Sequence, residues 1–185
     1  GKTIVCSTKL RCGKYLDLRV SPPKPKAIHL YFDIIEVIGT ETPGEKISSL
    51  TVLLFDQGPL FISDAFIEVE PSAAQIVRTT LASAQRIRDF GIVPNVALLS
   101  HSNFGSSRAA SAIKMRDAAR MLRKMAPELQ MDGEMHADAA MNESIRETLN
   151  RHSTLEGAAN LLIMPSLDAA NIAVELIRSI TDVMV

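Results

Sequence analysis

The chain has 185 residues, of which 46% are hydrophobic and 22% charged, and its formal net charge is −1. This composition is typical of one soluble globular domain, and the small net charge excludes the basic excess on which nucleic-acid binding depends. No apolar run approaches the roughly 18 residues that a transmembrane helix needs, and Lys2, Lys9 and Arg11 interrupt the pattern of a signal peptide. We therefore expect a cytoplasmic protein that binds neither nucleic acid nor a membrane.

Residues 1–30 carry little structural signal, and the pattern becomes clearer from residue 31. Cys6 and Cys12 are the only cysteines, and their spacing suits neither a zinc site nor a disulfide framework. The stretch SPPKPKA at 21–27 predicts a turn or linker, because each proline fixes φ and lacks an N–H donor. The stretch YFDIIEVIG at 31–39 predicts a short helix that stops at its glycine.

Strands and helices alternate along the rest of the chain. Apolar runs at 50–55 and 59–62 flank the turn sequence DQGP and predict a β-hairpin. The elements predicted after it are a helix over 71–91, a strand over 95–100, a helix over 107–125, a strand within 129–135, a helix over 136–150, a strand over 159–165 and a helix over 166–182. This alternation predicts an α/β fold with a mainly parallel sheet flanked by helices, to which the hairpin adds antiparallel strands.

Apolar residues at helical spacing indicate the core faces of the last two long helices. In the helix over 107–125 they are Ile113, Ala118, Leu122 and Met125. In the helix over 166–182 they are Leu167, Ile172, Leu176 and Ile180.

Three polar segments follow three of the predicted strands: SHSNFGSS at 100–107, MDGEMHADAAMN at 131–142 and MPSLDAAN at 164–171. In open α/β sheets, ligands bind beyond the carboxyl ends of the strands, where helix N-termini point N–H groups outward. We therefore expect the three segments to meet at one edge of the sheet and to form a cleft for an anion.

The candidate ligand-binding residues in these segments are polar, or are glycine, which allows close approach of the backbone: Ser100, Ser102, Asn103, Gly105, Ser106, Asp132, Glu134, His136, Asp138 and Asn171. Serine and asparagine side chains can donate hydrogen bonds to phosphate oxygens. The carboxylates can act as a general base or can fix loops by accepting backbone N–H groups, and histidine can titrate near neutral pH. We assign no catalytic residue.

Structural roles compete with ligand binding at several positions. Ser106 or Ser107 can cap the following helix, and Ser166 and Asp168 suit a helix start. The Asp-Gly pair at 132–133 is typical of a turn. These alternatives remain open.

The helix over 107–125 also carries a basic cluster made of Arg116, Arg120, Arg123 and Lys124. A solvated face and a phosphate contact are both compatible with it. His136 has no second histidine at metal-ligand spacing, so no metal site is expected. No glycine-rich phosphate loop, dinucleotide fingerprint or Gly-x-Ser-x-Gly elbow is present.

The sequences LLSHSNFGSS, DGEMHADAAMN and GAANLLIMPSLDAANIA, in this order and spacing, resemble the phosphate acetyl/butyryl transferase family. The resemblance covers about residues 45–182, while residues 1–44 form a poorly matched N-terminal segment. It implies a phosphotransacetylase-like fold of the isocitrate/isopropylmalate dehydrogenase type at 45–185. It also implies that the chain is a fragment of a longer protein.

Within the family, the loop is similar to that of the phosphotransacetylase-like C-terminal region of bacterial NADP-dependent malic enzymes. Free-standing transferases usually carry a lysine in a Ser-x-Ser-x-Lys-Gly-Ser loop, where this chain has Phe104. Losing that cation removes a charge suited to phosphate. The family's Ser-Arg pair and following aspartate, which serve catalysis, are expected beyond Val185.

The resemblance therefore implies assembly and acetyl-CoA-linked regulation, with acetyl-CoA or phosphate as the ligand, no cofactor in this fragment, and a homodimer or larger assembly. The full enzyme would convert malate to pyruvate with NADP and Mg or Mn. Small residues such as Ala109, Ala110, Ala118 and Ala119 are compatible with close packing between subunits. Two alternatives remain: a fragment of an active phosphate acetyltransferase, which makes acetyl phosphate and CoA from acetyl-CoA and phosphate, and a non-catalytic module of another host protein.

Overall fold

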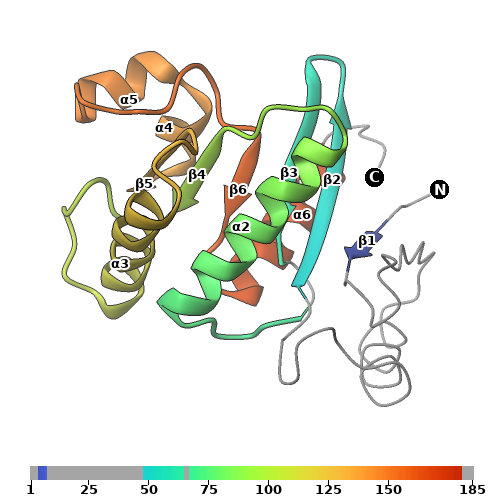
Figure 1. The fold of residues 1–185 in the computed structure, drawn as a ribbon, viewed down its shortest axis with the longest axis horizontal. Coiled ribbons are helices and arrows are strands. Elements are labelled where there is room, and N and C mark those ends of the chain that lie inside the picture. Colours follow the sequence, from blue (N-terminus) through green and yellow to red (C-terminus); the bar gives the residue numbers. More distant parts are fainter. Residues whose placement is uncertain (1–3, 8–47, 65–66, 181–185) are drawn as a thin grey trace.

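The computed structural model describes residues 4–7, 48–64 and 67–180, which form a twisted sheet between two layers of helices (Figure 1). Within these ranges the sheet has the strand order β1-β2-β3-β6-β4-β5. The predictions for residues 21–27 and 31–39 fall outside the described part of the chain.

The sheet combines an antiparallel half with a parallel half. β2 (Ser48–Phe55) and β3 (Gly58–Ser63) form the predicted hairpin, and β1 (Ile4–Ser7) pairs antiparallel with β2. β6 (Leu161–Ile163) pairs parallel with β3, and β4 (Val96–Leu99) lies between β6 and β5 (Met131–Met135), parallel to both. The predicted α/β fold is confirmed.

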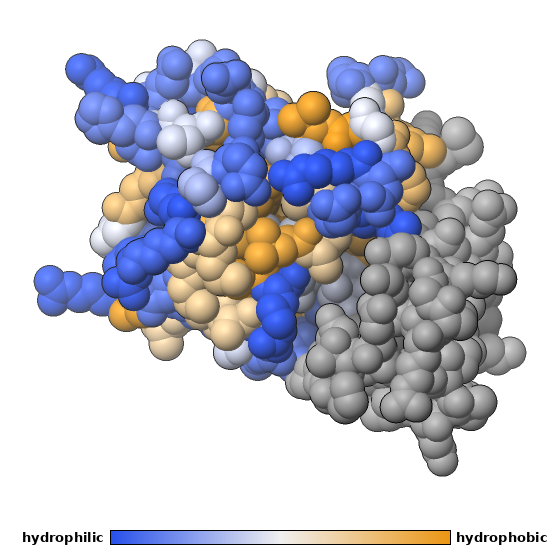
Figure 2. Space-filling model, in the orientation of Figure 1, coloured by the Kyte–Doolittle hydropathy of each residue, from blue (hydrophilic) through white to orange (hydrophobic). Residues whose placement is uncertain are grey.

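Alternate residues of the strands face two separate cores, as the pleat of a strand requires. Val96 and Leu98 lie in one core with residues of α2 (Ala73–Asp89) and α3 (Ala110–Met125). Ala97 and Leu99 lie in the other core with residues of α4 (Ala137–Met141) and α6 (Leu167–Ile180). On the side seen in Figure 2, hydrophilic residues surround apolar residues near the centre of the face.

Helix α2 begins two residues later than predicted because of a capping box. The Ser72 side chain accepts a hydrogen bond from Gln75 N at 3.3 Å, and the Gln75 side chain accepts one from Ser72 N at 2.9 Å. The predicted stop is confirmed: Gly91 has a φ of 76° and donates its N–H to Arg88 O at 2.8 Å.

The single helix predicted over 136–150 is wrong, because Asn142 divides the segment into α4 and α5 (Glu143–Leu149). Asn142 has extended backbone (φ −131°, ψ 110°), and its side chain caps α5 by accepting a hydrogen bond from Ile145 N at 3.3 Å. Asparagine favours this capping position over the interior of a helix.

The Asp-Gly pair at 132–133 lies within strand β5 and does not form a turn. Gly133 has a φ of 142°, and a Cβ atom at this position would lie 2.7 Å from Leu98 O on the neighbouring strand. Glycine is therefore required here by both the backbone conformation and the close approach of β4.

The predicted core faces of α3 and α6 are partly wrong. Ala118 and Leu122 are buried, but Ile113 and Met125 of α3 are 41% and 61% exposed. Helix α6 turns Ala170 and Val174 to the sheet, so that Ile172, Leu176 and Ile180 are exposed. Because α6 is apolar on more than one side, hydrophobic spacing alone could not show which side meets the sheet.

Candidate functional site

The segments that follow β4, β5 and β6 leave the sheet at the same edge, because these three strands are parallel neighbours. This confirms the predicted common edge of the three polar segments. Lys114 on α3 donates its Nζ–H to Pro165 O at 2.7 Å and lies 3.2 Å from Glu70 Oε2. The Lys114 side chain therefore joins the segment after β3 to the segment after β6.

The loop over 100–107 lies along β5, the last strand of the sheet. Ser100 N donates to Met135 O at 2.8 Å, and the Asn103 side chain accepts a hydrogen bond from His136 N at 2.7 Å. The loop thus continues the hydrogen bonding between β4 and β5 beyond the end of β4.

Glu134 lies beneath this loop, and its side chain is only 1% exposed. Its Oε1 atom accepts hydrogen bonds from Ser102 Oγ at 2.8 Å, Gly105 N at 2.8 Å and Arg116 Nη2 at 2.9 Å. Its Oε2 atom accepts one from Arg116 Nε at 3.1 Å. Both oxygens of this predicted site residue are therefore occupied within the protein.

The environment of Glu134 keeps the carboxyl group ionised. Burial alone would raise its pKa, but hydrogen bonds from Arg116, Gly105 and Ser102 outweigh burial and lower the pKa below its ordinary value. The hydrogen bond with Glu134 likewise raises the pKa of Arg116. The two residues form a stable ion pair at neutral pH.

The loop also uses most of its own donors. Ser102 is fully buried, and its hydroxyl oxygen accepts a hydrogen bond from Ser107 N at 3.0 Å. Backbone N–H groups that donate within the protein belong to Ser100, Ser102, Asn103, Phe104, Gly105, Ser106 and Ser107. In this conformation these backbone amides are not available to a ligand, because they are already bonded within the protein. The serine hydroxyl groups are the donors that the loop can offer to a ligand.

Neither Ser106 nor Ser107 is the N-cap residue of α3, although Ser107 bonds the start of the helix. The N-cap residue of α3 is Ala109, which has no side-chain cap. Ser107 Oγ accepts a hydrogen bond from Ala109 N at 3.1 Å and lies 3.1 Å from His101 Nε2. Ser107 therefore stabilises the entry to the helix from two residues before the cap.

Asp132 is also buried, and its partners hold it away from the loop. It forms an ion pair with Arg123 and accepts hydrogen bonds from Gly133 N at 2.8 Å and Asn150 Nδ2 at 3.2 Å. The basic cluster of α3 is thus neither wholly solvated nor free for phosphate, because Arg123 and Arg116 bind buried carboxylates of β5.

The remaining predicted residues lie at the starts of helices. His136 is the exposed N-cap residue of α4, and Asp138 is exposed in its first turn. Asn171 lies in α6, where it is half-buried. Ser166 Oγ accepts a hydrogen bond from Ala169 N at 3.3 Å, which confirms the helix-start role of Ser166.

Asp64 is a residue at this edge that the sequence analysis missed. It directly follows β3, has a φ of 53°, and accepts hydrogen bonds from Ile67 N and Glu68 N, both at 3.2 Å. Burial raises its pKa although these hydrogen bonds oppose the change. The sequence does carry a signal for it, because Asp64 closely follows a predicted strand. Aspartate is also suited to the positive φ at this position, which it tolerates better than most residues.

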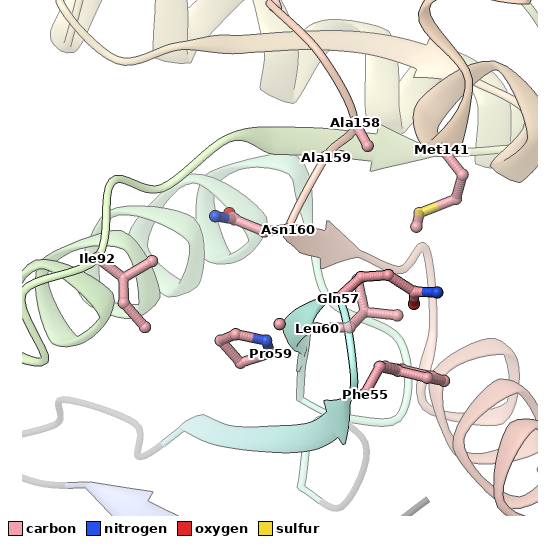
Figure 3. Close-up of a pocket in the computed structure, with 10 residues that line it drawn as sticks. Phe55, Gln57, Pro59, Leu60, Ile92, Met141, Ala158, Ala159 and Asn160 are labelled. Atoms are coloured by element: carbon pink, nitrogen blue, oxygen red, sulfur yellow. The ribbon is translucent and has the colours of Figure 1, made fainter.

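A pocket of about 380 Å³ opens at the opposite, amino-terminal edge of the parallel strands (Figure 3). Its lining residues come from the hairpin turn, from the segments before β4 and β6, and from α4: Phe55, Gln57, Gly58, Pro59, Leu60, Ile92, Met141, Ala158, Ala159 and Asn160. None of the predicted site residues lines it. The described residues contain no group of three His, Cys, Asp or Glu side chains that could hold a metal ion.

Comparison with known proteins shows which family the chain belongs to. The family model described as "Phosphate acetyl/butaryl transferase" matches residues 17–185. The chain belongs to this family. Among solved structures, phosphotransacetylase EutD from Staphylococcus aureus superposes with a TM-score of 0.73 and 27% identity, covering 81% of this chain and 47% of EutD.

Two malic enzymes are more similar in sequence. The NAD-dependent malic enzyme of Rhizobium meliloti is 45% identical over 150 residues, and the NADP-dependent malic enzyme of Escherichia coli is 44% identical over 151 residues. Each match covers 81% of this chain and 20% of the relative. The chain thus spans about a fifth of the length of these relatives. No helix in the described ranges is long and apolar enough to cross a membrane.

Proposed function

We propose that this chain is the C-terminal phosphotransacetylase-like part of a bacterial malic enzyme, and that it serves assembly and acetyl-CoA-linked regulation. The observation that carries the proposal is the 44–45% identity with two malic enzymes, compared with 27% for the EutD phosphotransacetylase. In the full protein, another region would oxidatively decarboxylate malate to pyruvate with NADP and a divalent metal. The described residues offer no cluster of metal ligands that would hold this metal.

The loop over 100–107 supports regulation more than acyl transfer. Phe104 occupies the position where the resemblance implies a lysine, and its half-buried ring packs against the core beneath α4 and α6. The nearby guanidinium of Arg116 is neutralised by Glu134. Acyl transfer to phosphate needs preorganised positive charge at the reacting group, and this loop supplies little of it.

Regulation requires only that the ligand bind two conformations of the enzyme unequally. The carboxyl-terminal edge of the parallel sheet is where ligands of α/β proteins bind, and it carries Ser100, Ser106 and His136. Acetyl-CoA is the ligand we propose at this edge, with inorganic phosphate as a smaller competitor for the same donors.

We also propose a homodimer or larger assembly in the cytoplasm. Ala118 and Ala119 give no support, because both are buried in the core of the chain. The support comes from α6, whose Ile172, Leu176 and Ile180 are 64%, 57% and 72% exposed at a spacing of four residues. Apolar side chains aligned on one helix face are typical of a surface that another element covers.

The alternative function is that of an active phosphate acetyltransferase fragment, which the common fold with EutD favours. An assay of the full-length protein separates the two. We expect malate-dependent NADPH formation whose rate changes with acetyl-CoA, and no acetyl phosphate from acetyl-CoA and phosphate. Sustained production of acetyl phosphate and CoA in the absence of malate would establish the alternative.

A further inference from the structure

Helix α3 contacts strand β5 through two ion pairs, each between an arginine of α3 and a carboxylate of β5. Arg116 pairs with Glu134 and Arg123 pairs with Asp132, and both carboxylates are buried. The pairs differ in one respect. Glu134 accepts hydrogen bonds from the loop over 100–107, whereas the partners of Asp132 lie on α3, on β5 itself and at Asn150.

We propose that Glu134 is the positioning residue of the carboxyl-edge site: held by Arg116, its carboxylate fixes the loop over 100–107 in the shape that meets the ligand, without touching the ligand. The ligand in this statement rests on the proposed function. The fixing of the loop rests on the geometry alone.

Glu134 is poorly suited to bind an anionic ligand itself. Its side chain is only 1% exposed, and Arg116, Ser102 and Gly105 occupy its oxygens. A buried carboxylate would also repel a phosphate group. The residue therefore acts on the site through the loop.

The hydrogen bonds form a closed circuit that starts and ends at Glu134. Ser102 Oγ donates to Glu134 and accepts from Ser107 N, and Ser107 O accepts a hydrogen bond from Arg116 Nη2 at 2.9 Å. The circuit closes through the bidentate pair of Arg116 with Glu134. A second link ties the middle of the loop to the same residue, because Phe104 N donates to Glu134 O at 2.8 Å.

A glutamine cannot replace Glu134 in this circuit. Its single carbonyl oxygen could keep the donors now at Oε1, but its amide nitrogen would then face Arg116 Nε, which is also a donor. Glu134→Gln therefore breaks one hydrogen bond and removes the charge that holds the others. Asp132→Asn makes the same chemical change in the matched pair, and that pair has no bond to the loop.

Hydrogen exchange of the chain without ligand tests the fixing of the loop. In Glu134→Gln we expect the amides of Gly105 and Ser107 to exchange at least about tenfold faster, as expected for the loss of a charge-assisted hydrogen bond. In Asp132→Asn we expect these two amides to change no more than the amides of β4. Equal acceleration of the loop in both variants, or none in Glu134→Gln, would overturn the proposal.

Ser102→Ala keeps the test decisive if Glu134→Gln does not fold. This variant leaves the Arg116 pair intact and removes one of the contacts between loop and carboxylate. We expect faster exchange at Ser107, whose N–H loses its acceptor. Unchanged exchange at Ser107 would count against the circuit.

Calorimetry of the full-length protein with acetyl-CoA adds the ligand. We expect Glu134→Gln to weaken binding at least about tenfold and Asp132→Asn to change it less than about twofold. Equal affinity in wild type and Glu134→Gln would overturn the positioning role. If wild type does not bind acetyl-CoA, the proposed function fails, while the exchange experiment still decides whether Glu134 fixes the loop.

Discussion

Arg146 is fully buried, yet its carboxylate partner Glu143 stands 3.8 Å away and is half exposed. The charge of Arg146 is instead met by carbonyl oxygens at the end of α4 and in the loop after α5. Its Nη1 donates to Ala139 O at 3.0 Å, and its Nη2 donates to Leu155 O and Gly157 O at 2.8 and 2.7 Å. One side chain thus holds α4, α5 and the segment leading to β6 together.

The first prediction concerns this contact. Arg146→Met should reduce the free energy of unfolding by at least about 3 kcal/mol, because several buried carbonyl groups lose their donors. Glu143→Gln should cost less than about 1 kcal/mol, because its carboxylate is half exposed. Urea denaturation of both variants measures the difference, and equal losses would show that the ion pair is the main interaction of Arg146.

The second prediction is a pH dependence. The pKa of Glu134 is lower in the folded protein, so its contribution to stability is present above the unfolded pKa of about 4.3. That contribution is lost as the pH falls through the lower folded pKa. We expect wild type to lose more stability than Glu134→Gln between pH 6 and acid pH. Parallel stability curves for the two proteins would contradict this.

The third prediction concerns two glycines. Gly133→Ala should destabilise the protein severely, because the added Cβ would lie 2.7 Å from Leu98 O. Gly157→Ala is the matched control: Gly157 also has positive φ, at 66°, but a Cβ there meets nothing within 4 Å. Its cost should be about 1 kcal/mol, from backbone strain alone. Thermal denaturation of both variants compares them, and similar melting temperatures would be inconsistent with the close packing of β5 on β4.

The fourth prediction concerns Phe104. Phe104→Lys should weaken packing beneath the loop and place a cation beside the serine hydroxyls, so phosphate should bind more tightly while stability falls. Phe104→Leu should share the loss of stability without the gain in phosphate affinity. Calorimetry with inorganic phosphate and urea denaturation measure the two effects, and tighter binding by both variants would show that charge is not the cause.

The fifth prediction concerns α6. Leu176→Glu should reduce self-association while leaving the fold intact, because Leu176 is already 57% exposed. Met125→Glu, on the exposed end of α3 at 61%, is the control. Light scattering of the variants gives the assembly size. A monomeric wild-type protein would remove the basis for an interface on α6.

The sequence predicts the alternation of elements and the shared edge of three loops because both follow from local patterns: apolar periodicity, turn residues, and the direction of parallel strands. It could not show the partners of Arg116 and Arg123. Their carboxylates lie on β5, and only the packing of α3 against that strand reveals that Glu134 and Asp132 are buried.

The sequence pattern does not predict the break at Asn142, although asparagine is a common N-cap residue. The apolar spacing on its two sides is compatible with one continuous helix, and this spacing hides the capping preference of Asn142. The sequence predicts the site residues by their chemical type alone, which does not show their burial. The structure adds that Ser102, Asp132 and Glu134 are buried, while His136 and Asp138 face solvent.

The most direct test of the proposed function is hydrogen exchange of the full-length protein with and without acetyl-CoA. Binding at the carboxyl-terminal edge predicts protection of the segments at 100–107 and 164–171, together with an altered rate of malate oxidation. Protection confined to the pocket at the amino-terminal edge, which Phe55 and Asn160 help to line, would contradict the proposed function. The absence of any protection at saturating acetyl-CoA would contradict it as well.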